Sequence, residues 1–150
     1  MKIWRLLLLL TGCSLGPTPD LVSSHGVSFF WKGSSWSLEQ INEQENWFID
    51  QLDPLSNGYK RFDTQPDMRN VVVYVYGDKI PCGRSSQTGF CNGLQDYNIL
   101  YVRDMGCVFN SAYTHELMHW FQQSLKSYTD YDHGEQNIWP IADGAPHGCI

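Results

Sequence analysis

His115 and His119 stand four residues apart in the segment NSAYTHELMHW (110–120), and Glu116 directly follows the first of them. On an α-helix, residues i and i+4 lie on one face about 5–6 Å apart, so the two imidazoles could hold one zinc ion together. The helical period of 3.6 residues per turn places Glu116 beside them, where its carboxylate could take a proton from a metal-bound water. These residue types at this spacing predict metal-assisted hydrolysis, with Zn²⁺ as the cofactor and Glu116 as the general base.

Two amphipathic helices are predicted. Residues 111–127 have helical spacing, with Asn110 or Ser111 as the cap, and they carry the two histidines. Residues 37–53 have the same spacing, with Ser37 as the N-cap and Gln40 as its capping-box partner. We expect this helix to end before Pro54. The apolar residues expected to form the core face of the motif helix are Ala112, Met118, Phe121 and Leu125.

Two strands are predicted between these helices, at 70–77 and at 96–104, from their β-branched and aromatic content. The segment after residue 127 is interrupted by glycine and proline and is expected to be mostly loop. A chain of 150 residues supports one core. The sequence therefore predicts a single α+β domain.

The HELMH segment, with a helix and strands before it, resembles the zincin metallopeptidases, whose motif is HExxH. The resemblance implies a minimal zincin-like fold: a backing helix, a small mixed sheet, the active-site helix and a loop-rich C-terminal segment. It also implies a peptide or protein substrate, lying extended and antiparallel along an exposed edge strand, which we place at 97–103.

A catalytic zinc ion needs a third protein ligand. His133 is our first choice, because a neutral imidazole is a better zinc ligand than a lone carboxylate, and Glu135 is the alternative. Asp130 and Asp132 are lesser candidates, and either could instead orient a histidine ligand.

The third histidine of the metzincin group is missing, because Gln122 and Leu125 stand where that pattern has glycine and histidine. His147 is a further candidate imidazole, although its better functional interpretation is as a donor to the oxyanion. Tyr131 and Tyr128 could stabilise the transition state in the same way. Trp120 and Trp139 are expected to be core or cleft-wall residues.

The N-terminus has the order of an export signal, with Lys2 and Arg5 before a leucine run. LTGC (10–13) resembles the lipobox of bacterial lipoproteins, which implies cleavage before Cys13 and lipidation of that cysteine. We therefore expect a signal peptide at 1–12, a lipid-anchored linker at 13–28 that includes a solvated His25, and the domain at 29–150. We expect the protein either to be anchored by its lipid in a membrane of the bacterial cell envelope or to be secreted. Ser14, directly after Cys13, suggests that the membrane is the outer membrane.

Four cysteines follow Cys13, an even number in a chain expected to leave the cytoplasm. We favour two disulfide bonds, Cys82 to Cys91 and Cys107 to Cys149, among three possible pairings. The second bond would tie the C-terminal segment to the start of the motif helix. A zinc site made of all four cysteines is the weaker alternative, because no two of them are spaced as C-x₂-C.

The formal net charge of the chain is −6, and its lysines and arginines are scattered. No basic stripe is available to neutralise a phosphate backbone, so nucleic acid is not an expected partner. Two functions remain: a zinc-dependent peptidase, or a non-catalytic zinc-binding or partner-binding envelope lipoprotein on a zincin scaffold. Glu116 favours the peptidase, because a scaffold that only binds zinc does not need a carboxylate in the position of the general base.

Overall fold

The structure is a computed structural model that describes residues 16–31, 33–58, 67–78, 80–81, 90–126 and 144. Its main sheet has the order β1-β2-β3-β7-β6, and a separate two-stranded sheet pairs β4 with β5. The strands span Leu21–Val22 (β1), Ser28–Trp31 (β2), Val72–Tyr76 (β3), Ile80–Pro81 (β4), Phe90–Cys91 (β5), Gly93–Asp96 (β6) and Ile99–Arg103 (β7). The α-helices span Leu38–Gly58 (α1) and Tyr113–Lys126 (α2), and short 3₁₀ helices span Met68–Asn70 (η1) and Val108–Asn110 (η2). The predicted α+β class, with two helices and a small mixed sheet, is confirmed.

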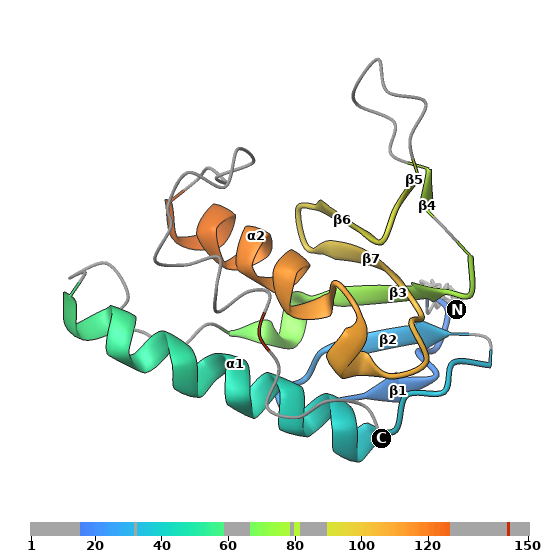
Figure 1. Cartoon of the computed structure of the whole chain (residues 1–150), viewed down its shortest axis with the longest axis horizontal. Coiled ribbons are helices and arrows are strands. Elements are labelled where there is room, and N and C mark those ends of the chain that lie inside the picture. The colour runs from blue at the N-terminus through green and yellow to red at the C-terminus, as the bar shows by residue number, and fades with distance from the viewer. Residues whose placement is uncertain are drawn as a thin grey trace, which may run out of the picture.

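The three central strands of the main sheet are parallel, and the two outer strands are antiparallel to their neighbours. Parallel neighbours need a long connection, which α1 provides between β2 and β3. Both helices lie side by side across one face of the sheet (Figure 1). The fold has two layers, and α2 lies closest to β6 and β7.

The core lies between the helices and the inward side chains of the strands. Phe29, Val73 and Leu100 face it from three neighbouring strands with no exposed surface. Tyr113, at the start of α2, packs edge-on against Phe29 with ring centroids 5.5 Å apart. Near the other end of α2, Phe121 meets Phe48 of α1 at 6.4 Å. Burial of these large side chains, at roughly 1.5–3 kcal/mol each, fixes α2 at both ends.

The first helix begins as predicted. Ser37 Oγ accepts from the Gln40 N–H at 3.2 Å, and Gln40 Oε1 accepts from the Ser37 N–H at 3.0 Å, which is the capping box. The predicted end before Pro54 is wrong, because α1 continues to Gly58. Pro54 has no N–H to donate to the carbonyl of Asp50, so the helix loses one hydrogen bond there. Because Asp50 lies on the exposed side of the helix, its carbonyl is not left unpaired in the core, and the helix can continue.

The strand predicted at 70–77 is present as β3, but the strand predicted at 96–104 is partly wrong. Tyr97 and Asn98 form a turn, so Asp96 ends β6 and Ile99 begins β7. Alternating side chains on both strands hid the turn, since neither glycine nor proline marks it. The edge is also misplaced, because β7 pairs with β3 on one side and β6 on the other.

The domain begins earlier than residue 29. Leu21 and Val22 pair with β2, and Val27 is fully buried, although all three lie in the predicted linker. His25 is half-buried and shares a hydrogen bond with Asn46 of α1 at 2.8 Å, so the expectation of a solvated histidine is wrong. The predicted signal peptide and Cys13 lie outside the described residues. No described helix is long and apolar enough to cross a membrane.

Glu45 of α1 is buried, and Tyr113 Oη donates to its Oε1 at 2.6 Å. Burial raises the pKa of Glu45, and hydrogen bonds from Tyr113 and Ser23 offset part of that increase. Between its ordinary pKa and the raised folded value, the folded state binds more protons than the unfolded state. The contribution of Glu45 to stability therefore falls as pH rises through this interval.

We predict that Glu45→Gln removes this pH dependence, because the amide still accepts from Tyr113 but carries no charge. The unfolding free energy of the variant relative to wild type should increase as pH rises from the ordinary pKa of a glutamate to the raised folded pKa of Glu45, by about 1.4 kcal/mol for each pH unit between the two values. Urea unfolding at several pH values measures it. Glu39→Gln, at the exposed start of α1, is the control. The same dependence of the unfolding free energy on pH in wild type and in Glu45→Gln would show that burial does not raise the pKa of Glu45.

Candidate metal and hydrolytic site

His115, Glu116 and His119 all lie on α2, as predicted. Its start is set by Ser111, whose Oγ accepts from the Tyr113 N–H at 3.2 Å and donates to the Val108 carbonyl at 2.6 Å. Of the predicted core face, Met118 and Phe121 are buried and Ala112 is half-buried, while the side chain of Leu125 is not described. His115 and His119 therefore lie on the same face of one helix, as their four-residue spacing predicts.

The imidazole rings of His115 and His119 have centroids 5.0 Å apart and planes inclined at 74°. His119 is 6 % exposed and His115 is half-buried, so the pair lies at the boundary between the core and the surface. Two neighbouring neutral imidazoles at this separation fit two of the four positions around a zinc ion, whose Zn–N distance is about 2.0–2.1 Å. The described donor set therefore fits half of a tetrahedral site.

Within the described part of the chain, no three His, Cys, Asp or Glu side chains gather into a metal-binding group. Several predicted site residues lie outside that part. They are His133, Glu135, His147, Tyr128, Tyr131, Asp130, Asp132 and Trp139. Trp120, by contrast, is buried, and its Nε1 donates to Asn98 Oδ1 at 3.1 Å, so this tryptophan ties α2 to the β6–β7 turn.

Glu116 is 5 % exposed and points towards β6. Its burial raises its pKa to about 8. A cation held by the neighbouring imidazoles would oppose that increase, because an opposite charge favours the carboxylate form. Glu116 is thus a buried carboxyl group next to His115 in the chain and one helical turn before His119.

Gly93 of β6 makes room for Glu116. A Cβ atom on Gly93 would lie 2.7 Å from Glu116 Cγ and 2.8 Å from Ala112 Cβ, distances that real Cβ atoms do not adopt. Only glycine allows the strand to approach α2 this closely. The sequence analysis missed this residue, and its only signal was an isolated glycine at the start of a strand-like run.

A hollow of about 520 Å³ opens where α2 begins. Its lining residues come from β5, β6, η2 and α2, and both His115 and Glu116 face it. The full set is Cys91, Asn92, Gly93, Phe109, Asn110, Ser111, Ala112, His115 and Glu116. The motif is therefore reachable from a polar cleft.

The loop between β7 and α2 is held by Asp104, which accepts from Trp36 Nε1 at 3.0 Å, from the Ser35 N–H at 3.1 Å and from the Gly106 N–H at 2.9 Å. Burial alone would raise the pKa of Asp104, but these hydrogen bonds and one from Ser34 outweigh it and lower the pKa. Cys107 follows in this loop and, like Cys91, is disulfide-bonded. The partner cysteines are not described, so the pairing remains a prediction.

β6 is the edge strand of the main sheet on the side of the cleft. The Arg103 N–H donates to the Asn92 carbonyl at 2.8 Å, which makes these two residues a hydrogen-bonded pair. Such pairs alternate along an antiparallel ladder, so the N–H and C=O groups of Gly93 and Gln95 face away from β7. Among the described strands β6 pairs only with β7, so these groups can accept a further strand beside Glu116.

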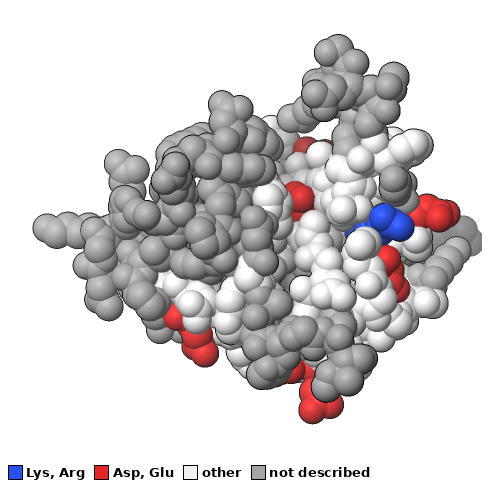
Figure 2. Space-filling model, in the orientation of Figure 1, with Lys and Arg blue, Asp and Glu red and all other residues white. Residues whose placement is uncertain are grey.

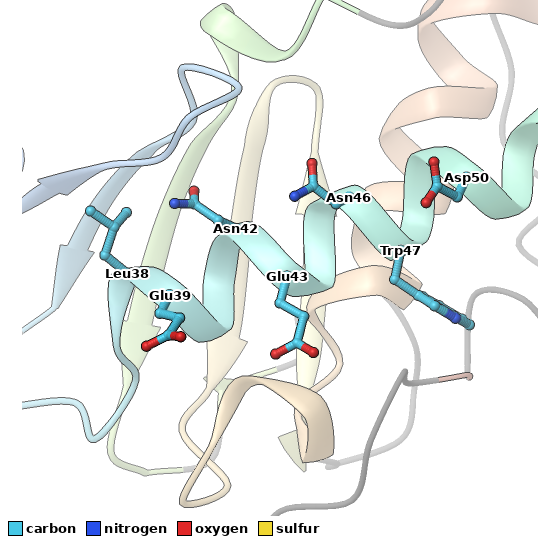
Figure 3. Close-up of a pocket in the computed structure, with 7 residues that line it drawn as sticks. All are labelled: Leu38, Glu39, Asn42, Glu43, Asn46, Trp47 and Asp50. Carbon is cyan, nitrogen blue, oxygen red and sulfur yellow. The ribbon is translucent and has the colours of Figure 1, made fainter.

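A larger hollow, of about 860 Å³, lies away from the motif along the outer side of α1. Figure 3 shows its side chains leaving the helix in rows spaced by four residues, with Asn42, Asn46 and Asp50 in one row and Glu39 and Glu43 in the other. It contains carboxylates and amides but no histidine or cysteine. Figure 2 shows acidic side chains at several separate places on the face of the molecule seen in Figure 1. Size alone does not make this hollow a site, and we place the chemistry at the smaller cleft.

Comparison of the chain with protein-family models, with curated proteins and with solved structures finds no match.

We predict that Gly93→Ala destabilises the protein by about 1–3 kcal/mol, because the added methyl group overlaps Glu116 and Ala112. Thermal or urea unfolding measures the effect. Gly77→Ala is the matched control, since a Cβ there would meet no atom within 4 Å. Equal stability of the two variants would show that β6 does not approach α2 closely.

Proposed function

We propose that the protein is a zinc-dependent peptidase of zincin-like fold that hydrolyses peptide bonds in an extended substrate. The observation that carries the proposal is the placement of Glu116, desolvated between the histidine pair on α2 and the edge strand β6. A non-catalytic zinc-binding or partner-binding lipoprotein is the alternative. The buried carboxylate facing an open cleft favours the enzyme, because burial of a carboxyl group is costly and zinc binding alone does not require it.

The chain's own residues would divide the reaction among them. His115 and His119 would hold Zn²⁺, which when bound supplies a Lewis acid and an acidified water. Glu116 would accept the proton of the attacking water and pass it to the leaving amine. The main-chain groups of Gly93 and Gln95 would hold the substrate as an added strand, which keeps the scissile bond beside Glu116.

His133 is proposed as the third zinc ligand, with Glu135 as the alternative and with His147 or Tyr131 as donors to the oxyanion. The disulfide bonds are proposed as Cys82 to Cys91 and Cys107 to Cys149. Support for the first bond comes from the β4–β5 ladder, in which Ile80 pairs with Cys91 and Pro81 with Phe90. Cys82 follows Pro81 directly in the sequence, and Pro81 lies on the strand that pairs with that of Cys91. Lipidation of Cys13 and an envelope location remain part of the proposal.

We predict that the purified domain contains one zinc ion and cleaves an unstructured protein, and that a chelator stops this cleavage. Glu116→Gln should lower turnover by at least about 100-fold while zinc stays bound. The amide keeps the shape of the side chain but cannot accept the proton. Metal analysis and a fluorogenic peptide assay measure both quantities. Glu39→Gln, on the exposed start of α1, should behave as wild type. Zinc binding with undiminished turnover in Glu116→Gln would exclude Glu116 as the base.

For the third ligand, we predict that His133→Ala loses zinc on dialysis against a weak chelator, whereas Glu135→Ala and His147→Ala retain it. Loss of one protein ligand weakens zinc binding by orders of magnitude, while loss of a supporting group costs about 10–100-fold. His119→Ala is the positive control for zinc loss. If Glu135→Ala or His147→Ala is the variant that loses zinc, that residue is the ligand instead.

A further inference from the structure

We infer that the pocket at the tip of the β6–β7 hairpin is a substrate subsite, in which Tyr97 selects an uncharged planar side chain N-terminal to the scissile bond. The inference rests on the proposed peptidase function and specifies what that site would prefer. It depends on the position of the pocket, the conformation of Tyr97 and the chemistry of the lining residues.

The pocket has a volume of about 330 Å³ and lies between the hairpin turn and the last turns of α2. Tyr97 and Asn98 form one wall, and Gln123 and Ser124 form the other. The volume is at the lower end of the range of about 300–1,000 Å³ that ligand pockets span, which suits one side chain.

The turn that carries Tyr97 is fixed on several sides. Gln95 Nε2 donates to the Tyr97 carbonyl at 2.7 Å and also to Gln123 Oε1. The Asn98 carbonyl accepts from the Val72 N–H at 2.9 Å, and its side chain accepts from Trp120. The wall of the pocket is therefore a preorganised part of the fold.

Tyr97 has a φ of 53°, in the left-handed region that glycine and asparagine adopt most readily, and it is the only described non-glycine residue with a positive φ. Tyr97 as a whole is 71 % exposed, so burial of the ring does not offset the cost of this conformation. A two-residue hairpin turn calls for a positive φ at its first residue, so the informative observation is that an exposed aromatic residue stands there in place of glycine or asparagine, which supports a binding role.

The distance from Glu116 to the pocket is similar whether it is followed along β6 or along α2. Four residues of strand separate Gly93 from Tyr97, about 13 Å, and seven residues of helix separate Glu116 from Gln123, about 10 Å. A peptide added to the free edge of β6 would therefore bring to the pocket the side chain three to four residues from the bond at Glu116. If it runs antiparallel to β6, that residue precedes the scissile bond.

The four lining residues supply a phenol ring, two amides and a hydroxyl group, and none of them carries a charge. An aromatic ring or a planar amide can stack on Tyr97 and share hydrogen bonds with the opposite wall. A carboxylate would lose hydration there without gaining a cation. The preferred side chains are therefore those of tyrosine and glutamine, and aspartate is disfavoured.

The test uses two series of fluorogenic peptides with one scissile sequence, made once a cleaved sequence has been found. In each series tyrosine, glutamine or aspartate occupies one position, three residues before the scissile bond in the first series and four residues before it in the second. For wild type we expect kcat/KM to be about tenfold higher with tyrosine or glutamine than with aspartate, in one of the two series. Tyr97→Gly should reduce this ratio to below twofold, and Tyr97→Phe should keep the preference for tyrosine. Tyr76→Ala, which removes an exposed aromatic residue from β3, should keep the full ratio.

Tyr97→Gly also relieves the backbone strain, so we expect its melting temperature to equal or exceed that of wild type, which separates loss of selectivity from loss of fold. A wild-type ratio near one at both positions, or a Tyr97→Gly ratio equal to that of wild type, overturns the subsite while the peptidase function stands. Absence of cleavage of any peptide by the zinc-loaded protein overturns the peptidase function and the subsite with it.

Discussion

The close approach of β6 to α2 at Gly93 and Glu116 is the constraint on which the candidate site depends. A strand that packs this near to a helix needs a residue without a side chain at the point of contact, and Gly93 meets that need. The same contact removes Glu116 from water and leaves the outward main-chain groups of β6 beside the carboxylate. One steric requirement thus produces both the desolvated acid and the strand edge that could present a substrate to it.

The remaining packing holds α2 in the position that this contact requires. Tyr113 fixes the start of the helix through Phe29 of the sheet and the buried carboxylate of Glu45. Trp120 joins the middle of the helix to the turn after β6. Because α2 is anchored to the sheet before and after the two histidines, their rings keep a defined separation. A metal site gains affinity from such preorganisation, since less conformational entropy is lost on binding.

Local signals in the sequence predicted the elements whose stabilisation is local. The Ser37–Gln40 capping box and the helical spacing of α2 depend on neighbours within four residues, and both are confirmed. The sequence could not predict which strand forms the edge, because strand order depends on contacts between distant segments. Nor could it reveal the turn at Tyr97, where an aromatic residue occupies a conformation usual for glycine. Gly93 and Glu45 matter only through partners on other elements, so the isolated glycine before a strand-like run could not reveal its contact with α2, and nothing around Glu45 indicated its burial.

The choice between the two proposed functions, an enzyme or a binding scaffold, depends on the free energy that it costs to keep Glu116 buried. A carboxyl group with a pKa near 8 is costly to ionise, and replacing it by an apolar residue would remove that cost. A scaffold that held zinc only for stability would need the two imidazoles and a further ligand, but not this carboxylate. In a hydrolase the same cost is useful, because a desolvated carboxylate accepts a proton more readily than one in water. The cleft lined by His115, Glu116 and Gly93 opens on the side of the edge strand β6, and in the proposed peptidase it would give a substrate access to the carboxylate.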